Sequence, residues 1–244
     1  MSVKFKLKSR ENWVRFPLDR LNLDQELKDR FLESCPEIPA GLIEKILSID
    51  QLGSYSFYLD EDHLGLAEIE QKPLYIDIES ALNYHTKVYE NKGYKNEPFY
   101  KSIKSKDMNV IDITCGMMGD SLLMHSWGFE IQAYEANPIT SCLILNALKN
   151  RPLKNFKFIA EEFNFDFYSK GVVFYDPFFR KTKEKTMPKK SMQVLRDFDH
   201  YEILDRPSGI KKVVVKRPKG AEQIWSEVHH QYHGKSVRYD VYSC

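Results

Sequence analysis

The chain has 244 residues, of which 42% are hydrophobic and 29% are charged, and its formal net charge is +1. Its 15 Phe and 14 Tyr supply enough apolar surface for a core, which excludes global disorder. No apolar run approaches the roughly 20 residues that cross a bilayer, so we expect no membrane partner. With so small a net charge, any nucleic-acid partner has to meet a local basic patch.

The first ten residues, MSVKFKLKSR, carry charge but lack the apolar stretch of a secretory signal. The four cysteines are scattered without metal-ligand spacing, and the seven histidines show no such spacing either. We therefore expect a cytoplasmic protein with reduced thiols and no metal site.

The N-terminal region predicts a small set of mixed helices and strands. Apolar residues alternate with lysines over 3–8, which predicts a short edge strand, and helical spacing predicts helices over 24–33 and 39–49. Three strand-like runs between 55 and 79 indicate a small antiparallel unit, the last of them PLYIDIE. Residues 81–104 are expected to be helical with one interruption.

From Val110 onward, strands alternate with helices, which favours a parallel sheet with helices on both faces. We therefore place a domain boundary near residue 105. The expected strands cover 110–114, 130–137, 156–160, 171–177 and 211–218, followed by a closing hairpin over 225–232 and 236–243.

Chemistry in such sheets lies beyond the carboxyl ends of the strands. The first strand runs into DITCGMMGD, in which Gly116 and Gly119 let a ligand approach the backbone at the start of a helix. The spacing does not fit the dinucleotide-binding G-x-G-x-x-G pattern. Glu135 ends the second strand, where a carboxylate can accept hydrogen bonds from the ribose of a nucleoside cofactor. By itself, Glu135 is equally well explained as a solvated carboxylate.

The sequence Asp176-Pro177-Phe178-Phe179 follows the fourth strand and is the most specific pattern in the chain. The Asp176 carboxylate and the Pro177 carbonyl can accept hydrogen bonds from an exocyclic amine on a flat base, while an aromatic ring stacks on that base. The alternative is a turn followed by two core phenylalanines.

Residues 180–219 hold thirteen Lys or Arg against five Asp or Glu. Such a run is often only a solvated face, but here it borders the proposed base pocket, where cations can hold phosphates. We favour this function for Lys189, Lys190, Lys216 and Arg217, because the last two end a strand.

Taken together, these motifs resemble the bacterial RsmJ-type methyltransferases, which transfer a methyl group from S-adenosylmethionine to N2 of a guanine in 16S ribosomal RNA. The similarity covers roughly residues 55–244. The chain departs from the family pattern at Met118, where the family has glycine, and at Ala136 and Arg180. The matching segments are DITCGMMGD from Asp112, YEANP from Tyr134, FYDPFFRKT from Phe174, PKKSMQVLRDF from Pro188, KKVVVKRP from Lys211 and VRYDVY from Val237.

The resemblance implies a class I methyltransferase fold, a Rossmann-like doubly wound α/β sheet with a C-terminal antiparallel hairpin over 105–244, preceded by a small α+β region over 1–104. It implies 16S ribosomal RNA or the 30S subunit as partner and S-adenosylmethionine as cofactor, with no metal. The implied cofactor-binding residues are Asp112, Gly116, Gly119, Asp120, Glu135, Ala136, Glu162 and Asp176. The implied catalytic residues are Asp176, Pro177 and Phe179, and the expected RNA-binding residues are Lys181, Lys189, Lys190, Lys216 and Arg217.

Two alternatives stay open at this point. The first is a methyltransferase that acts on another planar amine, in adenine of RNA or DNA or in a protein amide. The second is a non-catalytic RNA-binding relative that has lost affinity for the cofactor.

Overall fold

The computed structural model describes residues 13–21, 23–49, 52, 54–61, 63–68, 71–90, 93–165, 170–177, 205 and 209–243. The edge strand expected over 3–8 lies outside them. The described residues divide into two compact units: the first holds those up to Ala81 together with Asn137–Leu153, and the second holds Leu82–Ala136 and those from Lys154 onward. The domain boundary near residue 105 stays a prediction. No helix in the described part of the chain is long and apolar enough to cross a membrane.

The first unit is built on a three-stranded antiparallel sheet in the order β1-β2-β3. Phe31 packs between Phe16 and Phe57, with ring centroids 5.2 Å and 5.3 Å apart, and all three rings are buried. The elements of this unit are β1 (Val14–Pro17), α1 (Leu18–Leu21), α2 (Gln25–Ser34), α3 (Ala40–Leu47), β2 (Tyr55–Leu59), β3 (Leu64–Glu68) and α7 (Pro138–Asn150).

The strand predicted from PLYIDIE is wrong. Only an isolated bridge between Leu66 and Leu74 forms there, and helix α4 (Ile78–Glu90) begins where the strand was expected to end. The cause is Asp77, whose carboxylate accepts hydrogen bonds from the backbone N–H and the hydroxyl of Ser80, at 2.9 Å and 2.7 Å. Such a cap satisfies the free N–H groups of a first helical turn and therefore starts a helix. The predicted helices over 24–33 and 39–49 are confirmed as α2 and α3.

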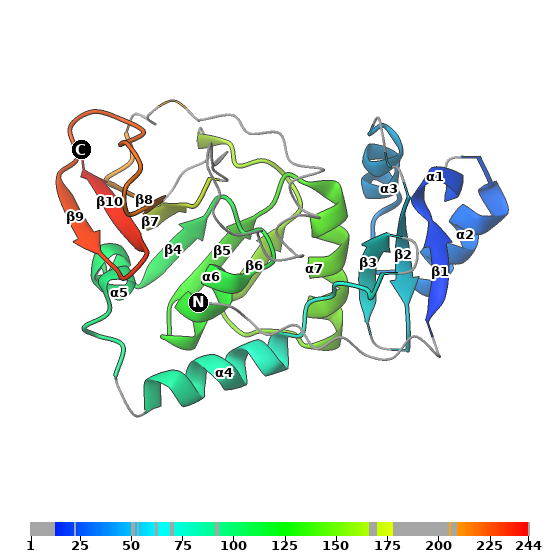
Figure 1. Ribbon diagram of the computed structural model, residues 1–244, viewed down its shortest axis with the longest axis horizontal. Helices are drawn as coiled ribbons and strands as arrows, with labels where there is room; N and C mark the ends of the chain where they lie inside the picture. The colour runs from blue at the N-terminus through cyan, green and yellow to red at the C-terminus, as the bar shows by residue number, and fades with distance from the viewer. Residues whose placement is uncertain are drawn as a thin grey trace. The chain divides into compact units, whose positions relative to one another are not determined.

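The second unit holds a seven-stranded sheet in the order β6-β5-β4-β7-β8-β10-β9, drawn in Figure 1. Only β10 runs against the other six strands. The five strands predicted from the sequence are confirmed. The closing hairpin forms as well, with β10 inserted between β8 and β9, but its first arm begins at His230 and not near residue 225. The strands are β4 (Asn109–Asp112), β5 (Glu130–Tyr134), β6 (Phe156–Ile159), β7 (Val172–Tyr175), β8 (Lys212–Pro218), β9 (His230–His233) and β10 (Val237–Ser243).

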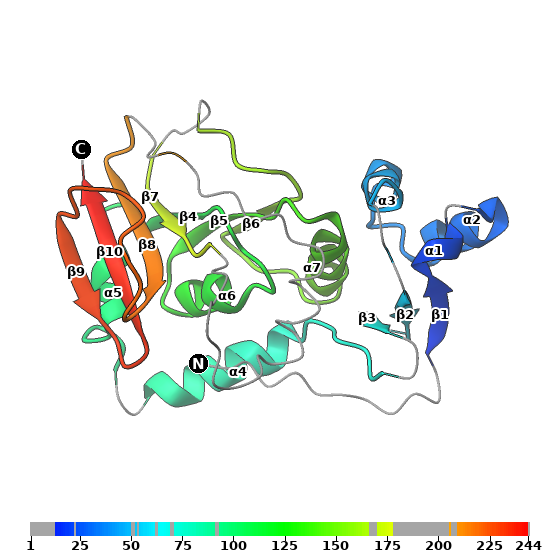
Figure 2. The same ribbon diagram turned by 45° about the horizontal axis from the view of Figure 1, so that its top comes forward.

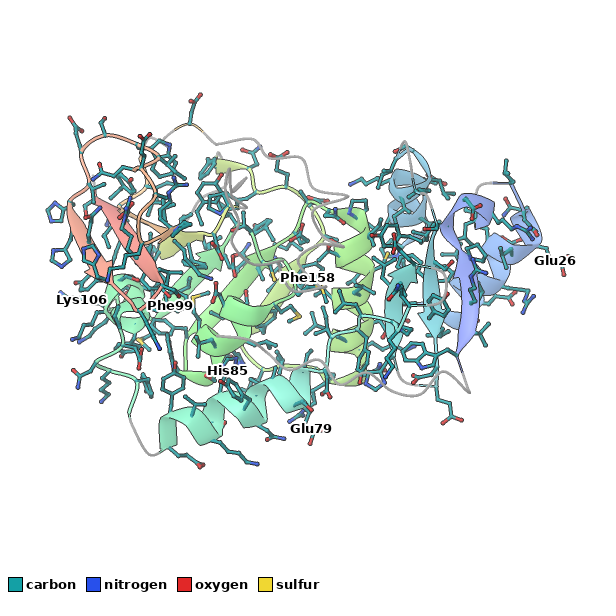
Figure 3. The ribbon with its side chains drawn as sticks, viewed as in Figure 1. Glu26, Glu79, His85, Phe99, Lys106 and Phe158 are labelled. Carbon is teal, nitrogen blue, oxygen red and sulfur yellow. The ribbon has the colours of Figure 1, made fainter. Side chains whose placement is uncertain are left out.

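Side chains that alternate along β7 fill both faces of this sheet. On one face, Phe174 contacts Phe99 of helix α5 (Pro98–Ile103), and Phe99, labelled in Figure 3, stacks on Tyr239 with centroids 4.8 Å apart. On the other face, Val173 and Tyr175 join a buried apolar cluster. Helix α6 (Gly119–Ser126) lies alongside β5 (Figure 2). Burial on both faces explains the nearly continuous apolar runs of these strands.

Strand β4 lies at the point where the strand order reverses, because the chain continues from β4 to β5 on one side and returns to β7 on the other. Ligands of open α/β sheets bind beyond the carboxyl ends of the strands at such a switch point. The carboxyl ends of β4, β5 and β7 are therefore where a site is expected.

Candidate active site

The loop after β4 is tied to both neighbouring strands. The backbone N–H of Cys115 donates to the carbonyl of Tyr134, at the end of β5, over 2.9 Å. The hydroxyl of Thr114 accepts the backbone N–H of Asp176, just past β7, over 2.7 Å. The first bond therefore holds the glycine loop to the end of β5, and the second holds it to the Asp176-Pro177 turn.

Glu135 and the glycine loop are in direct contact. The backbone N–H of Gly116 donates to Oε2 of Glu135 over 2.7 Å. Gly116 has a φ of +52°, a left-handed backbone that glycine adopts at little cost. The predicted ribose-binding carboxylate and the predicted glycine turn thus lie side by side.

Asp112 is buried at the end of β4 and is bound from two directions. Its carboxylate accepts hydrogen bonds from the Ser121 hydroxyl of α6 and from the backbone N–H of Thr114. Burial raises the pKa of Asp112 to about 7, although these two hydrogen bonds act to lower it. Asp112 therefore anchors α6 to the sheet, and its contact with a cofactor stays a prediction.

Lys216 joins two carboxylates that come from different parts of the second unit. Its Nζ donates to Oδ2 of Asp120, at the start of α6, over 2.5 Å, and to Oδ2 of Asp176 over 2.8 Å. The exposed fractions of these side chains are 22% for Lys216, 24% for Asp120 and 31% for Asp176. The three form a partly buried cluster at the carboxyl edge of the sheet.

Burial also determines how this cluster ionises. It raises the pKa of Asp176, Lys216 acts to lower that pKa, and Asp120 adds to the rise. Burial alone acts to lower the pKa of Lys216, but Asp120 and Asp176 outweigh it and hold that pKa well above its usual value. Lys216 is therefore a fixed cation between two carboxylates.

The other predicted residues lie in varied surroundings. Gly119 opens α6, and a Cβ built there has no neighbouring atom within 4 Å. Pro177 is buried next to Asp176, whereas Ala136 and Glu162 are exposed beyond β5 and β6. Arg217 is buried and donates from Nε to the carbonyl of Glu222 over 2.9 Å. The predicted residues outside the described part of the chain are Phe179, Lys181, Lys189 and Lys190.

Thr114 and Ser121 were not singled out from the sequence, yet both bind residues of the site. The Ser121 hydroxyl donates to the carboxylate of Asp112, and the Thr114 hydroxyl accepts the backbone N–H of Asp176. The available signal was position, since Thr114 lies two residues after β4 and Ser121 lies in the first turn of α6. Among the described residues, no group of three or more His, Cys, Asp or Glu could hold a metal ion.

The site suits a cationic nucleoside. S-adenosylmethionine carries a sulfonium and an ammonium, and the strand ends offer four carboxylates, those of Asp112, Asp120, Glu135 and Asp176, against one lysine. Glu135 would hold the ribose, and Gly119 leaves room for close approach to the backbone. The residues present therefore fit this cofactor.

Comparison with known proteins agrees with this geometry. The family described as "Putative SAM-dependent methyltransferase" matches residues 42–244. The ribosomal RNA small subunit methyltransferase J of Bdellovibrio bacteriovorus is 28% identical over 249 residues, which is 91% of this chain and 97% of the relative. The protein of the same name from Hahella chejuensis is 31% identical over 194 residues, which is 70% of this chain and 72% of the relative.

The crystal structure of a SAM-dependent methyltransferase from Neisseria gonorrhoeae shares the fold. It has a TM-score of 0.57 and 22% sequence identity, and the match covers 80% of this chain and 85% of that one.

The strand order, the switch-point site and these comparisons define a class I methyltransferase that uses S-adenosylmethionine. The predicted fold class and cofactor are thereby confirmed. The chain belongs to the family of ribosomal RNA small subunit methyltransferase J.

Proposed function

We propose that this enzyme methylates the exocyclic N2 amine of a guanine in 16S ribosomal RNA. The relatives named above support ribosomal RNA as the substrate, and the resemblance of the motifs supports the guanine amine. The observation that carries the proposal is the position of Asp176, directly after β7 and bound through its backbone to Thr114 in the glycine loop. A carboxylate at this place can hold an amine beside the cofactor.

Asp176 and Pro177 align the acceptor. The Asp176 carboxylate and the Pro177 carbonyl each accept a hydrogen bond from the amine, so that its lone pair faces the methyl donor. When bound, S-adenosylmethionine supplies the methyl group on a sulfonium, and the displaced group is a neutral thioether. The amine then loses a proton to solvent or to Asp176, whose raised pKa makes it a usable acceptor. No metal is needed, because the leaving group is neutral.

We assign the remaining contacts on the same basis. Gly116, Gly119 and Asp120 hold the methionine side of the cofactor, and Asp112 at the end of β4 is a further cofactor-binding residue. Glu135 and Ala136 bind ribose and adenine, and Glu162 lies near the adenine amine. Phe179 stacks on the target base.

The negatively charged phosphates of the RNA backbone are bound by basic side chains. Lys181, Lys189 and Lys190 contact phosphates, and Arg217 adds positive potential at the end of β8. Because small-subunit RNA is made and assembled in the cytoplasm of bacteria, we place the enzyme there.

The experiment is transfer of a tritiated methyl group from labelled S-adenosylmethionine. The acceptors are unmodified 30S subunits, naked 16S RNA and DNA, followed by nucleoside analysis, with Asp176→Ala as the inactive control. We expect label in N2-methylguanosine from the 30S subunit or its RNA. Label in methyladenosine, in DNA or in protein would instead support another planar amine. No transfer by a protein that fails to bind the cofactor would support the non-catalytic alternative.

A further inference from the structure

Lys216 was expected to contact RNA phosphate, but its surroundings suit another task. Its ammonium lies 2.8 Å from Oδ2 of Asp176 and 2.5 Å from Oδ2 of Asp120, so it already has two anionic partners. Its charge is therefore largely neutralised within the site. An exposed lysine that meets phosphate has no such partners.

The stem of Lys216 is confined by its neighbours on the sheet. Lys216 lies opposite Tyr239 in the register of β8 and β10, and Tyr239 is itself buried and stacked on Phe99. Cross-strand neighbours share one face of the sheet, so the two side chains limit each other's freedom. This confinement holds the ammonium of Lys216 beside the carboxylate of Asp176, just after β7.

We propose that Lys216 is a positioning residue for methyl transfer, which holds one oxygen of Asp176 and keeps this carboxylate ionised to accept the substrate amine. The inference rests on the proposed function, since it assigns Lys216 a task within that reaction. Because Lys216 occupies Oδ2, the amine hydrogen bonds to Oδ1.

The charges around Asp176 explain why it needs a cation. Two neighbouring carboxylates repel each other, so both stay ionised only when a nearby positive charge offsets the repulsion. Burial, Asp120 and the nearby Asp112 all disfavour ionised Asp176, and the largest effect that opposes them is that of Lys216. The phenol of Tyr239 also borders the cluster, but its pKa is raised by burial, so it stays neutral. If Asp176 were protonated, it would offer a donor where the amine needs an acceptor.

The first test measures ionisation of Asp176 without any need for activity. Carboxyl ¹³C resonances are titrated by NMR, and Asp176→Asn identifies the signal. In Lys216→Met we expect the pKa of Asp176 to rise by about 1–3 pH units, the effect of losing a close opposite charge. In Asp120→Asn, which keeps Lys216 and removes the competing carboxylate, the pKa of Asp176 is expected to fall. The matched control is Lys212→Met, which removes a lysine from the same strand that donates to the carbonyl of Lys104 instead.

The second test is the pH profile of methyl transfer. In Lys216→Met the acid limb of kcat/KM is expected to move to higher pH, by the same amount as the pKa of Asp176 measured by NMR. At pH 6 the value of kcat/KM then falls by roughly tenfold for each pH unit of that shift. Lys216→Arg is expected to restore the limb, and Lys212→Met to leave it in place. The salt dependence of RNA binding is expected to stay that of the parent protein.

Three results would separate the possibilities. An unchanged Asp176 titration in Lys216→Met overturns the proposal, whatever the enzyme methylates. An unmoved acid limb, with a salt slope reduced by about 0.7–0.9, assigns Lys216 to a phosphate contact and also overturns it. A parent protein that methylates no RNA defeats the proposed function, while the NMR titration still decides whether Lys216 keeps Asp176 ionised.

Discussion

The backbone N–H of Gly116 donates to the carboxylate of Glu135 over 2.7 Å, although 19 positions separate the two residues. This bond joins the loop after β4 to the end of β5 and places the carboxylate that we propose binds ribose before any ligand arrives. Because the acceptor is held in advance, little conformational entropy is lost when a cofactor binds.

Glu135→Ala is expected to weaken S-adenosylmethionine binding by about 1.5–3 kcal/mol, the usual cost of losing hydrogen bonds to a charged group. Isothermal titration measures this loss, and Glu130→Ala, at the other end of β5, serves as the matched control. Parent-like affinity in a folded Glu135→Ala protein would remove Glu135 from the cofactor site.

Asp176→Ala is expected to lower methyl transfer by about 100-fold or more, because the amine loses the group that positions it. The variant should keep most of its thermal stability, since Lys216 retains Asp120 as a partner. Single-turnover rates and thermal unfolding check the two parts. A large fall in Tm would show that the carboxylate is structural, and an intact rate would show that it does not hold the base.

Met118 provides a test of backbone strain. It is buried and has a φ of +61°, in the position where the resembling family has glycine. Met118→Ala loses packing and keeps the strain, whereas Met118→Gly loses packing and relieves it. We therefore expect Met118→Gly to be more stable than Met118→Ala by about 1–2 kcal/mol, although glycine is usually the less stable of the two. Urea unfolding gives the order, and the reverse order would contradict a left-handed residue here.

Asp112 predicts a specific pH dependence of stability. Burial raises its folded-state pKa to about 7 from an ordinary value of 3.8, so folding takes up a proton between these values. Because the folded state binds more protons there, the contribution of Asp112 to stability is greatest below pH 4 and is lost as the pH rises to 7. Asp112→Asn removes this loss, so its free energy of unfolding relative to the parent is expected to increase from pH 4 to pH 7. A constant difference between the two proteins would show that Asp112 is ionised throughout.

The basic segment supplies a prediction about RNA. Replacement of both Lys189 and Lys190 by Ala is expected to weaken RNA binding and to reduce its salt slope by about 0.7–0.9 per lost phosphate contact, with cofactor binding unchanged. Phe179→Ala is the contrasting variant, because lost stacking costs about 1–3 kcal/mol with little change in slope. Binding measured across salt concentrations distinguishes them. Parent-like RNA affinity of the double variant at every salt concentration would remove these lysines from the interface.

The strands of the second unit were predictable because they are short, β-branched and apolar, as in GVVFYDP and KKVVVKRP. Their lateral order was not, since periodicity does not say that β10 pairs with both β8 and β9. The same limit applies to Lys216. Its place at a strand end was visible, but the two carboxylates that neutralise it come from α6 and from the turn after β7 and meet it only in the folded sheet. At Asp77, a local side-chain cap overrode strand-like alternation.

The position of β10 has a consequence for synthesis of the chain. β8 and β9 leave the ribosome before Val237–Ser243, yet each pairs with that later segment. Until it arrives, β9 has no place in the sheet and β8 presents an open edge. That edge includes Lys216, whose neighbour Tyr239 belongs to the missing strand. The surroundings of Asp176 are therefore completed only after Val237–Ser243 has been synthesised, when the glycine loop and its helix have already emerged.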